Sequence, residues 1–198
     1  MDLNETTYKI LLGLLVVAMN IIRFYFQRRY NVTHSIKVKE KASARERRMV
    51  WLMFFALAVP GMMWLFTPWL SFGQFYLPDV IRIAGFLLGV YAMWLFYYVH
   101  KMLGDNWSPV LEIRKEHTLV IRGPYKWVRH PMYSDMTLWL ISFVMITANW
   151  FYAITIATGL LILFVVRIPD EEKLMIEQFG EEYKRYMQRT RRIIPFIY

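Results

Sequence analysis

Four long apolar runs, separated by charged segments, form the pattern of hydrophobic and polar positions along the chain. They cover residues 10–22, 50–72, 83–99 and 136–166. A helix needs about 20 apolar residues to cross a bilayer. Each of the first three runs therefore predicts one transmembrane helix, with flanking residues completing the first and the third. The fourth run has 31 residues without a formal charge, which is long for one such helix and short for two.

The middle of the fourth run contains a turn signal. Residues 147–149 (TAN), followed by Trp150, are typical of a tight turn at a membrane interface. We interpret 136–166 as a helical hairpin, with one long tilted helix as the alternative. The hairpin predicts an all-α integral membrane protein with five transmembrane helices, three in residues 1–103 and two in residues 104–198. The whole chain is expected to form a single membrane domain.

The positions of the basic residues test the count of five helices. Of the 24 lysines and arginines, 22 fall in three segments, 23–48, 101–131 and 167–198. Five helices put all three segments on one side of the membrane, which the positive-inside rule makes the cytoplasmic side. The N-terminus is then outside and the C-terminus in the cytoplasm. Orientation and anionic lipids account for the net charge of +9, so no nucleic-acid partner is expected.

Composition supports a membrane protein and excludes some chemistry. The chain is 57% hydrophobic and 18% aromatic, which is more apolar than a soluble domain of this size. It has no cysteine, so disulfides, thiolate catalysis and cysteine-based metal sites are excluded. The histidines show no ligand spacing with the carboxylates, so no metal site is expected.

The first candidate site is the polar stretch RGPYKWVRHPMY, residues 122–133. Pro131 suits the first turn of a helix, so His130 is expected at a helix N-terminus, beside backbone N–H groups that bind anions. Tyr125 and Tyr133 offer faces for a cation or a flat ring. The alternative is an ordinary belt of interfacial aromatic and basic residues.

The second candidate is the pair Arg167 and Glu171, four residues apart at the end of the last apolar run. In a helix the two share one face, although Pro169 between them can kink the span. Ionisable residues where a span leaves the hydrocarbon are candidates for function. The alternative is a snorkelling arginine with a surface ion pair. The acidic residues Glu172, Glu177, Glu181 and Glu182 are expected on a solvated helix face.

The two candidates together resemble a known family. The motif consists of residues 117–120 (HTLV), Gly123, Tyr125, Arg129-His130-Pro131 and Tyr133, followed by Arg167, Glu171 and FGEEYKRY at 179–186. Its order and spacing are similar to those of the isoprenylcysteine carboxyl methyltransferases, and most of all to small prokaryotic, archaeal members. The resemblance covers 104–198, the catalytic half. Residues 1–103 resemble the family only as membrane helices.

The resemblance implies S-adenosylmethionine as methyl donor and S-adenosylhomocysteine as product. It implies a cytoplasmic cofactor pocket built from the 104–135 segment and the C-terminal helix. The residues implied in cofactor binding are His117, Thr118, Leu119, Val120, Tyr125, His130, Tyr133 and Glu171. Arg167 matches the arginine that faces the methyl acceptor, and Arg167 and Glu171 are the implied catalytic residues.

The resemblance leaves the methyl acceptor open. Carboxyl O-methylation of an isoprenylcysteine-like acceptor is the first expectation. N-methylation of a phospholipid amine is the main alternative, because the wider superfamily includes such enzymes. A sterol-reductase-like oxidoreductase using NADPH and a non-catalytic scaffold are further alternatives. A lipophilic or prenylated substrate is expected to enter from the bilayer, among membrane lipids, and the protein is expected to be a monomer.

Overall fold

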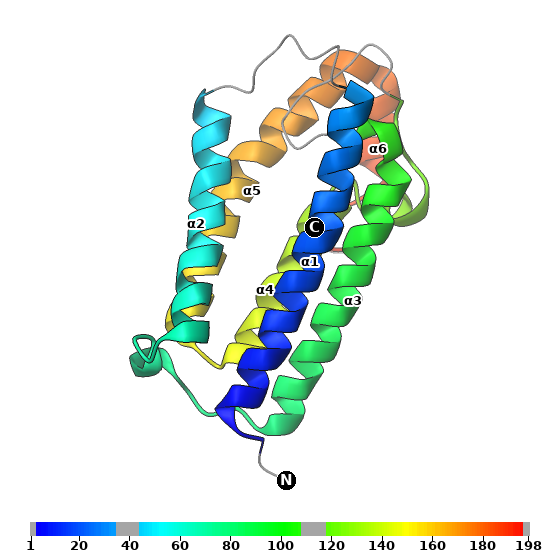
Figure 1. Ribbon diagram of the computed structural model, residues 1–198. Helices are drawn as coiled ribbons and strands as arrows, with labels where there is room; N and C mark the ends of the chain where they lie inside the picture. The colour runs from blue at the N-terminus through cyan, green and yellow to red at the C-terminus, as the bar shows by residue number, and fades with distance from the viewer. Residues whose placement is uncertain (1–2, 35–43, 108–117, 196–198) are drawn as a thin grey trace.

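The computed structural model describes residues 3–34, 44–107 and 118–195 as a bundle of helices (Figure 1). The helices are α1 (Glu5–His34), α2 (Ala44–Phe66), α3 (Asp79–Leu103), α4 (Pro131–Thr147), α5 (Trp150–Phe179) and α6 (Glu181–Arg189), with short 3-10 helices η1 (Ser71–Gly73), η2 (Gly104–Asn106) and η3 (Gly123–Lys126) between them. Within those ranges the structure has no β-strand. The predicted all-α fold is confirmed.

Four of the described helices, α1, α2, α3 and α5, are long and apolar enough to cross a membrane. Helix α4 has 17 residues, fewer than the roughly 20 that a crossing ordinarily needs. The count of five transmembrane helices and their orientation therefore stay predictions.

A turn divides the fourth apolar run into α4 and α5, as the sequence predicts. Ala148 has a left-handed backbone, with φ of 47°. Asn149 caps α5, because its side-chain oxygen accepts a hydrogen bond of 3.0 Å from the backbone N–H of Tyr152. A short polar side chain at this position satisfies an N–H group that the helix itself cannot. The alternative of one long tilted helix is excluded.

Small residues hold α3 and α4 close together. A Cβ atom on Gly85 would lie 2.5 Å from the Met145 side chain, and one on Gly89 would lie 2.7 Å from the Ser142 hydroxyl. The same hydroxyl donates a 2.8 Å hydrogen bond to the carbonyl oxygen of Gly85. Close backbone approach of this kind is how helices associate where lipid provides no hydrophobic driving force.

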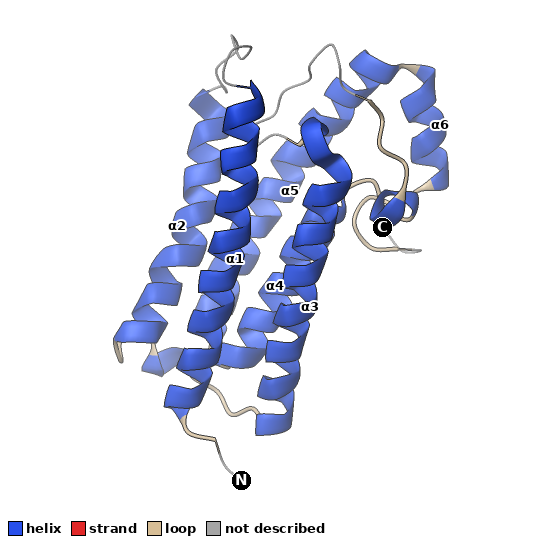
Figure 2. Cartoon of the chain, turned by 45° about the vertical axis from the view of Figure 1, so that its right-hand side comes forward, coloured by secondary structure: helices blue, strands red, loops and turns tan. Residues whose placement is uncertain are grey.

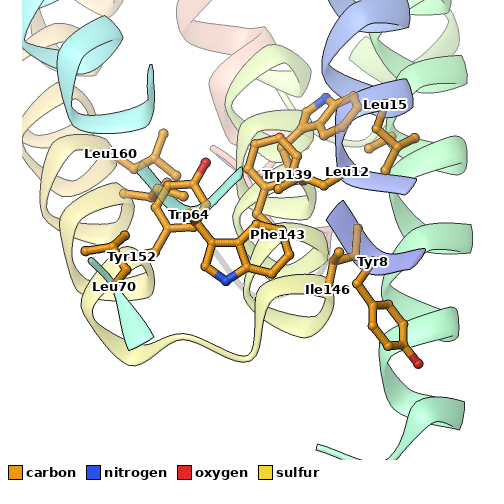
Figure 3. Close-up of a cluster of buried hydrophobic side chains, with 12 residues drawn as sticks. Tyr8, Leu12, Leu15, Trp64, Leu70, Trp139, Phe143, Ile146, Tyr152 and Leu160 are labelled. Atoms are coloured by element: carbon orange, nitrogen blue, oxygen red, sulfur yellow. The ribbon is translucent and has the colours of Figure 1, made fainter. Parts of the chain in front are cut away.

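Helix α4 lies at the centre of the bundle, packed against α1, α3 and α5, and α2 packs against α5 (Figures 1 and 2). Its side chains Trp139, Phe143 and Ile146 are buried in the apolar core beside Leu12 and Tyr152 (Figure 3). The two rings of Trp139 and Phe143 are 5.3 Å apart. This packing fixes the rotation of α4, and so decides which cavity its remaining side chains face.

One end of the bundle carries extra structure, and we call it the polar end. Here α5 continues through Pro169 to Phe179, and Gly180, with φ of 53°, turns the chain into α6 (Figure 2). The chain after α6 returns to the start of α4. There the backbone N–H groups of Arg129 and His130 donate to the carbonyl oxygens of Arg191 (2.8 Å) and Arg192 (3.0 Å).

Candidate active site

The start of α4 places His130 and Tyr133 at the polar end. Pro131 is the first residue of the helix and His130 its N-cap, as the sequence predicts, since proline has the backbone angle of a first turn and no N–H to leave unpaired. The preceding turn η3 begins at Gly123, with φ of 61°. A Cβ on Gly123 would lie 3.2 Å from the Tyr98 hydroxyl, so both backbone angle and space favour glycine there.

Most of the backbone N–H groups at this helix start already donate hydrogen bonds within the protein. Those of Tyr133 and Ser134 donate to the carbonyl oxygen of His130, and that of His130 donates to Arg192. The Ser134 hydroxyl donates to the carbonyl oxygen of Ile193. Binding of an anion here therefore depends on positively charged side chains more than on the helix N-terminus that the sequence suggested.

Glu171 connects the two candidate sites. Its Oε1 accepts hydrogen bonds from the Tyr133 hydroxyl (2.6 Å) and from Nε of Arg167 (2.9 Å). Its Oε2 lies 3.4 Å from Nδ1 of His130. The predicted sharing of one helix face by Arg167 and Glu171 is confirmed, in spite of Pro169. A simple surface ion pair is excluded, because Glu171 also contacts two residues of the α4 start.

Glu172 is a correction to the sequence analysis. Expected on a solvated face, it is 4% exposed and accepts from Nε of Arg129 at 2.6 Å and from Nη2 of Arg192 at 3.0 Å. Nε2 of His130 lies 3.3 Å from the same carboxylate. The returning chain and the start of α4 cover this side of α5, which local periodicity cannot show. The other three acidic residues, Glu177, Glu181 and Glu182, are exposed as expected.

His130 lies between the two glutamates, with one ring nitrogen facing each. Burial on its own lowers the pKa of His130, but the hydrogen bonds and negative charges of Glu171 and Glu172 outweigh it and raise the pKa above its ordinary value of 6.5. A protonated imidazole donates from both nitrogens, which suits a carboxylate on each side. The site thus contains four cationic groups (Arg129, His130, Arg167 and Arg192) around two carboxylates.

This charged cluster borders a cavity of about 400 Å³. Predicted cofactor residues that line the cavity are Thr118, Leu119, Val120, Tyr125, His130, Tyr133 and Glu171, together with Arg167. Asn106 holds Thr118 through hydrogen bonds of 3.1 and 3.2 Å. His117 lies outside the described residues. Apart from His117, all the predicted site residues meet at one cavity.

The cavity continues from the charged cluster into the apolar bundle. Met19 of α1 borders it on one side, and Met53 and Leu57 of α2 border it on another. Met136 of α4 and Leu160 of α5 also line it. A cavity with a charged end and an apolar interior fits an amphiphilic molecule. Among the described residues, no group of three or more His, Asp or Glu could hold a metal ion.

Fold and site together define a class: an all-helical membrane protein with a charged site that opens into an apolar cavity between its helices. Residues 83–177 match the model of the isoprenylcysteine carboxyl methyltransferase (ICMT) family. Through this region, just under half of the chain, the sequence is similar to that family. The match begins at α3, earlier than the 104–198 resemblance noted in the sequence.

Relatives with assigned names agree with this family. Over 96 residues the chain is 34% identical to protein-S-isoprenylcysteine O-methyltransferase B of Arabidopsis thaliana, covering 48% of this chain and 49% of the relative. Over 119 residues it is 32% identical to protein-S-isoprenylcysteine O-methyltransferase of Homo sapiens, covering 59% of this chain and 42% of the relative. The matches thus span about half the length of these relatives.

A solved structure extends the similarity across the fold. The eukaryotic intramembrane Ras methyltransferase ICMT superposes with a TM-score of 0.63, covering 96% of this chain and 68% of that one, at 21% sequence identity. At that identity the likeness shows the fold, so the activity has to be argued from the site.

Proposed function

We propose that the protein is an S-adenosylmethionine-dependent methyltransferase that esterifies the carboxylate of an isoprenylcysteine-like lipid at the cytoplasmic membrane face. The carrying observation is the cavity that joins the charged residues His130, Tyr133, Arg167 and Glu171 to an apolar space between helices. The names of the relatives support the reaction type. The density of basic residues in the segments at this end supports the cytoplasmic side.

The donor side of the site suits a zwitterionic head joined to a flat ring. Glu171 is a carboxylate for the donor's ammonium, and protonated His130 is a cation for its carboxylate. Tyr125 and Tyr133 line the same cavity and offer aromatic faces to a sulfonium or an adenine. When bound, the donor supplies an electrophilic methyl group. The chain's residues orient that donor and hold it beside the acceptor.

The acceptor side centres on Arg167. Its side chain lines the cavity, and its Nε donates a hydrogen bond to Glu171. A guanidinium binds a carboxylate through parallel N–H donors. The acceptor carboxylate is already ionised at neutral pH, so the transfer needs no general base. The role of Arg167 is to position the nucleophile rather than to move a proton.

The apolar part of the cavity is proposed to receive the prenyl chain. It lies between α1 on one side and α2 on the other, with Met19 and Met53 among its lining residues. A lipid tail can pass sideways between these helices from the bilayer, while the soluble donor arrives at the polar end.

The test is transfer of a labelled methyl group from S-adenosylmethionine to S-farnesylcysteine by the purified protein in lipid nanodiscs. A carboxyl methyl ester releases labelled methanol in base, whereas an N-methyl product is stable. Base-labile label is the expected result. A labelled product that is stable in base would instead support N-methylation of an amine. Binding of NADPH, with no binding of S-adenosylhomocysteine, would overturn the methyltransferase.

A further inference from the structure

A second hollow lies at the polar end, beside the cavity of the candidate active site. This groove, which we call the α6 groove, has a volume of about 970 Å³ and lies between α6, the chain that returns from it, and residues of the 119–127 segment. Leu119 and Tyr186 line both the groove and the cavity, so the two spaces adjoin. Four basic side chains line the groove, and the proposed mechanism uses none of them: Lys126, Arg185, Arg189 and Arg191.

Hydrogen bonds tie the walls of the groove together. The hydroxyl of the buried Tyr186 of α6 donates at 2.6 Å to the carbonyl oxygen of Tyr125 in η3, 61 residues earlier in the chain. The backbone N–H of Arg191 donates at 3.2 Å to the carbonyl oxygen of Trp127. The fold therefore brings basic side chains from distant segments to one groove, which a basic run in the sequence would not require.

The positive charge of the groove exceeds the negative charge beside it. All four basic side chains are exposed, and none of them forms an ion pair among the residues that the structure describes. Glu182 is the only acidic side chain among the described residues that line the groove. The nearby cations Lys184 and Arg192 are paired, with Glu181 at 2.7 Å and Glu172 at 3.0 Å. An excess of one charge in a concave surface attracts a ligand of the opposite charge.

Apolar side chains are exposed beside these charges. Trp127 is 52% exposed and Ile121 is 54% exposed, and both line the groove. The Nζ of Lys126 lies 5.5 Å from the centre of the Trp127 ring. Indole and basic side chains together are typical of the boundary between lipid headgroups and hydrocarbon. Figure 2 shows α6 on the outside of the bundle at the polar end, where such a boundary surrounds helices that cross a membrane.

The chemistry of the ligand follows from these surroundings. Guanidinium groups donate parallel hydrogen bonds to phosphate oxygens, and a lysine adds a point charge. A zwitterionic headgroup carries a cation of its own, which the excess of basic side chains repels. A soluble anion would make no use of the exposed Ile121, whereas an acyl chain would contact it. An anionic lipid satisfies both the charged and the apolar parts of the groove.

We propose that the α6 groove binds the phosphate headgroup of an anionic phospholipid, with Trp127 and Ile121 against the start of its acyl chains. Such binding is independent of the methyl-transfer reaction. A lipid bound there would hold α6 and the returning chain against the membrane, and that chain supplies Arg192 to the charged cluster of the candidate site.

Two lipids with the same acyl chains test the groove. The full-length protein in detergent micelles is mixed with equal amounts of dioleoylphosphatidylglycerol and dioleoylphosphatidylcholine, and native mass spectrometry measures which lipid stays bound. The wild-type protein is expected to retain phosphatidylglycerol about 10-fold more than phosphatidylcholine, as added charge-assisted hydrogen bonds give. K126Q/R189Q should lose most of this preference. R28Q/K101Q, which removes two exposed cations outside the groove, is the matched control and should keep it.

Each result decides the proposal. Equal retention of the two lipids by the wild type overturns it, and so does a preference that is unchanged in K126Q/R189Q. A loss of the same size in R28Q/K101Q is equally contrary, because the preference would then follow total charge. Inorganic phosphate at millimolar concentration should not displace the lipid, and displacement would assign the groove to a free phosphate instead. If thermal unfolding shows that K126Q/R189Q is not folded, R185Q/R191Q takes its place and must lose the preference.

Discussion

Both ends of the bundle bury an arginine beside carboxylates and a tyrosine, yet the two arrangements differ in what surrounds them. At the end opposite the polar end, Arg82 of α3 donates to both oxygens of Glu5 (2.8 and 3.0 Å) and to the carbonyl oxygen of Ile146 (2.9 Å). The Tyr8 hydroxyl donates to Asp79 at 2.6 Å, and the Arg82 guanidinium lies 3.5 Å from the centre of the Tyr8 ring. We call these four side chains, Glu5, Tyr8, Asp79 and Arg82, the Arg82 cluster.

The Glu171 cluster at the polar end (Arg129, His130, Tyr133, Arg167, Glu171 and Glu172) is built from the same kinds of contact. The Tyr133 hydroxyl donates to Glu171 at 2.6 Å, as Tyr8 donates to Asp79. The difference is the cavity. Members of the Glu171 cluster line it, and no member of the Arg82 cluster is among its lining residues. Paired buried charges alone therefore do not identify a site; their access to a space for a ligand does.

The largest effect is expected for Arg167→Ala. Methyl transfer should fall by about 100-fold or more, the size seen when a group that stabilises a reacting charge is removed. The affinity for S-adenosylhomocysteine should change much less, because the proposed role of Arg167 is to bind the acceptor. Arg167→Lys should recover little, since a point charge does not reproduce the guanidinium fork. Initial rates and calorimetric titration measure the two effects. A wild-type rate in Arg167→Ala would reject the acceptor site.

Arg82→Ala should act on stability alone. It breaks the connection between α1, α3 and α4, and leaves Glu5 without its partner. We expect a loss of about 2 kcal/mol in unfolding free energy, less than for a fully buried pair because Glu5 is half exposed. Thermal unfolding in detergent measures the loss. Affinity for S-adenosylhomocysteine, measured well below the transition, should match wild type, and a large drop would show that the two ends are coupled.

Tyr133 and Tyr8 each donate a hydrogen bond of 2.6 Å to a carboxylate, so removing each hydroxyl compares the two ends of the bundle directly. Tyr133→Phe removes the hydroxyl that donates to Glu171, and should weaken S-adenosylhomocysteine binding by about 10-fold. Tyr8→Phe removes the equivalent hydroxyl from Asp79 and should lower the melting temperature without changing that affinity. Both are measured by titration and thermal unfolding. Equal effects of the two substitutions on donor affinity would contradict our division of the bundle into a structural end and a functional end.

The smallest effect is a pH dependence of stability that originates at the polar end. Folding raises the pKa of His130 above 6.5, so its ion pairs stabilise the fold fully below pH 6.5. That stabilisation is lost as the pH rises through the raised pKa. The melting temperature should therefore decline in the wild type as the pH rises above 6.5, and His130→Gln should flatten that decline. A decline of the same size in His130→Gln would assign it to another group.

What the sequence predicts well here is local. The apolar runs locate the described membrane helices, because a helix long enough to cross a bilayer needs a continuous apolar segment. Asn149 reveals the turn between α4 and α5, because an N-cap acts within three residues. The four-residue spacing of Arg167 and Glu171 predicts their contact for the same reason.

What the sequence does not show depends on distant segments. Glu172 looks like its exposed neighbours along the chain, and only the return of Arg192 to the start of α4 reveals its burial. Arg82 and Glu5 are 77 residues apart, and no local pattern connects them. Asp135 directly precedes an apolar run, where an acidic residue is ordinarily solvated. Its burial depends on the rotation of α4 about its own axis, which packing against the neighbouring helices determines.

The return of the chain after α6 also sets an order of events during synthesis. Glu172 acquires Arg129 and His130 only when α5 folds against α4, and acquires Arg192 twenty residues of translation later. Until then an ionised carboxylate remains at the end of a helix that is entering the membrane, and water or lipid headgroups must solvate it. The helices can therefore be inserted while the site is still incomplete. The cluster is complete only once the segment that carries Arg192 has been made and has folded back to the start of α4.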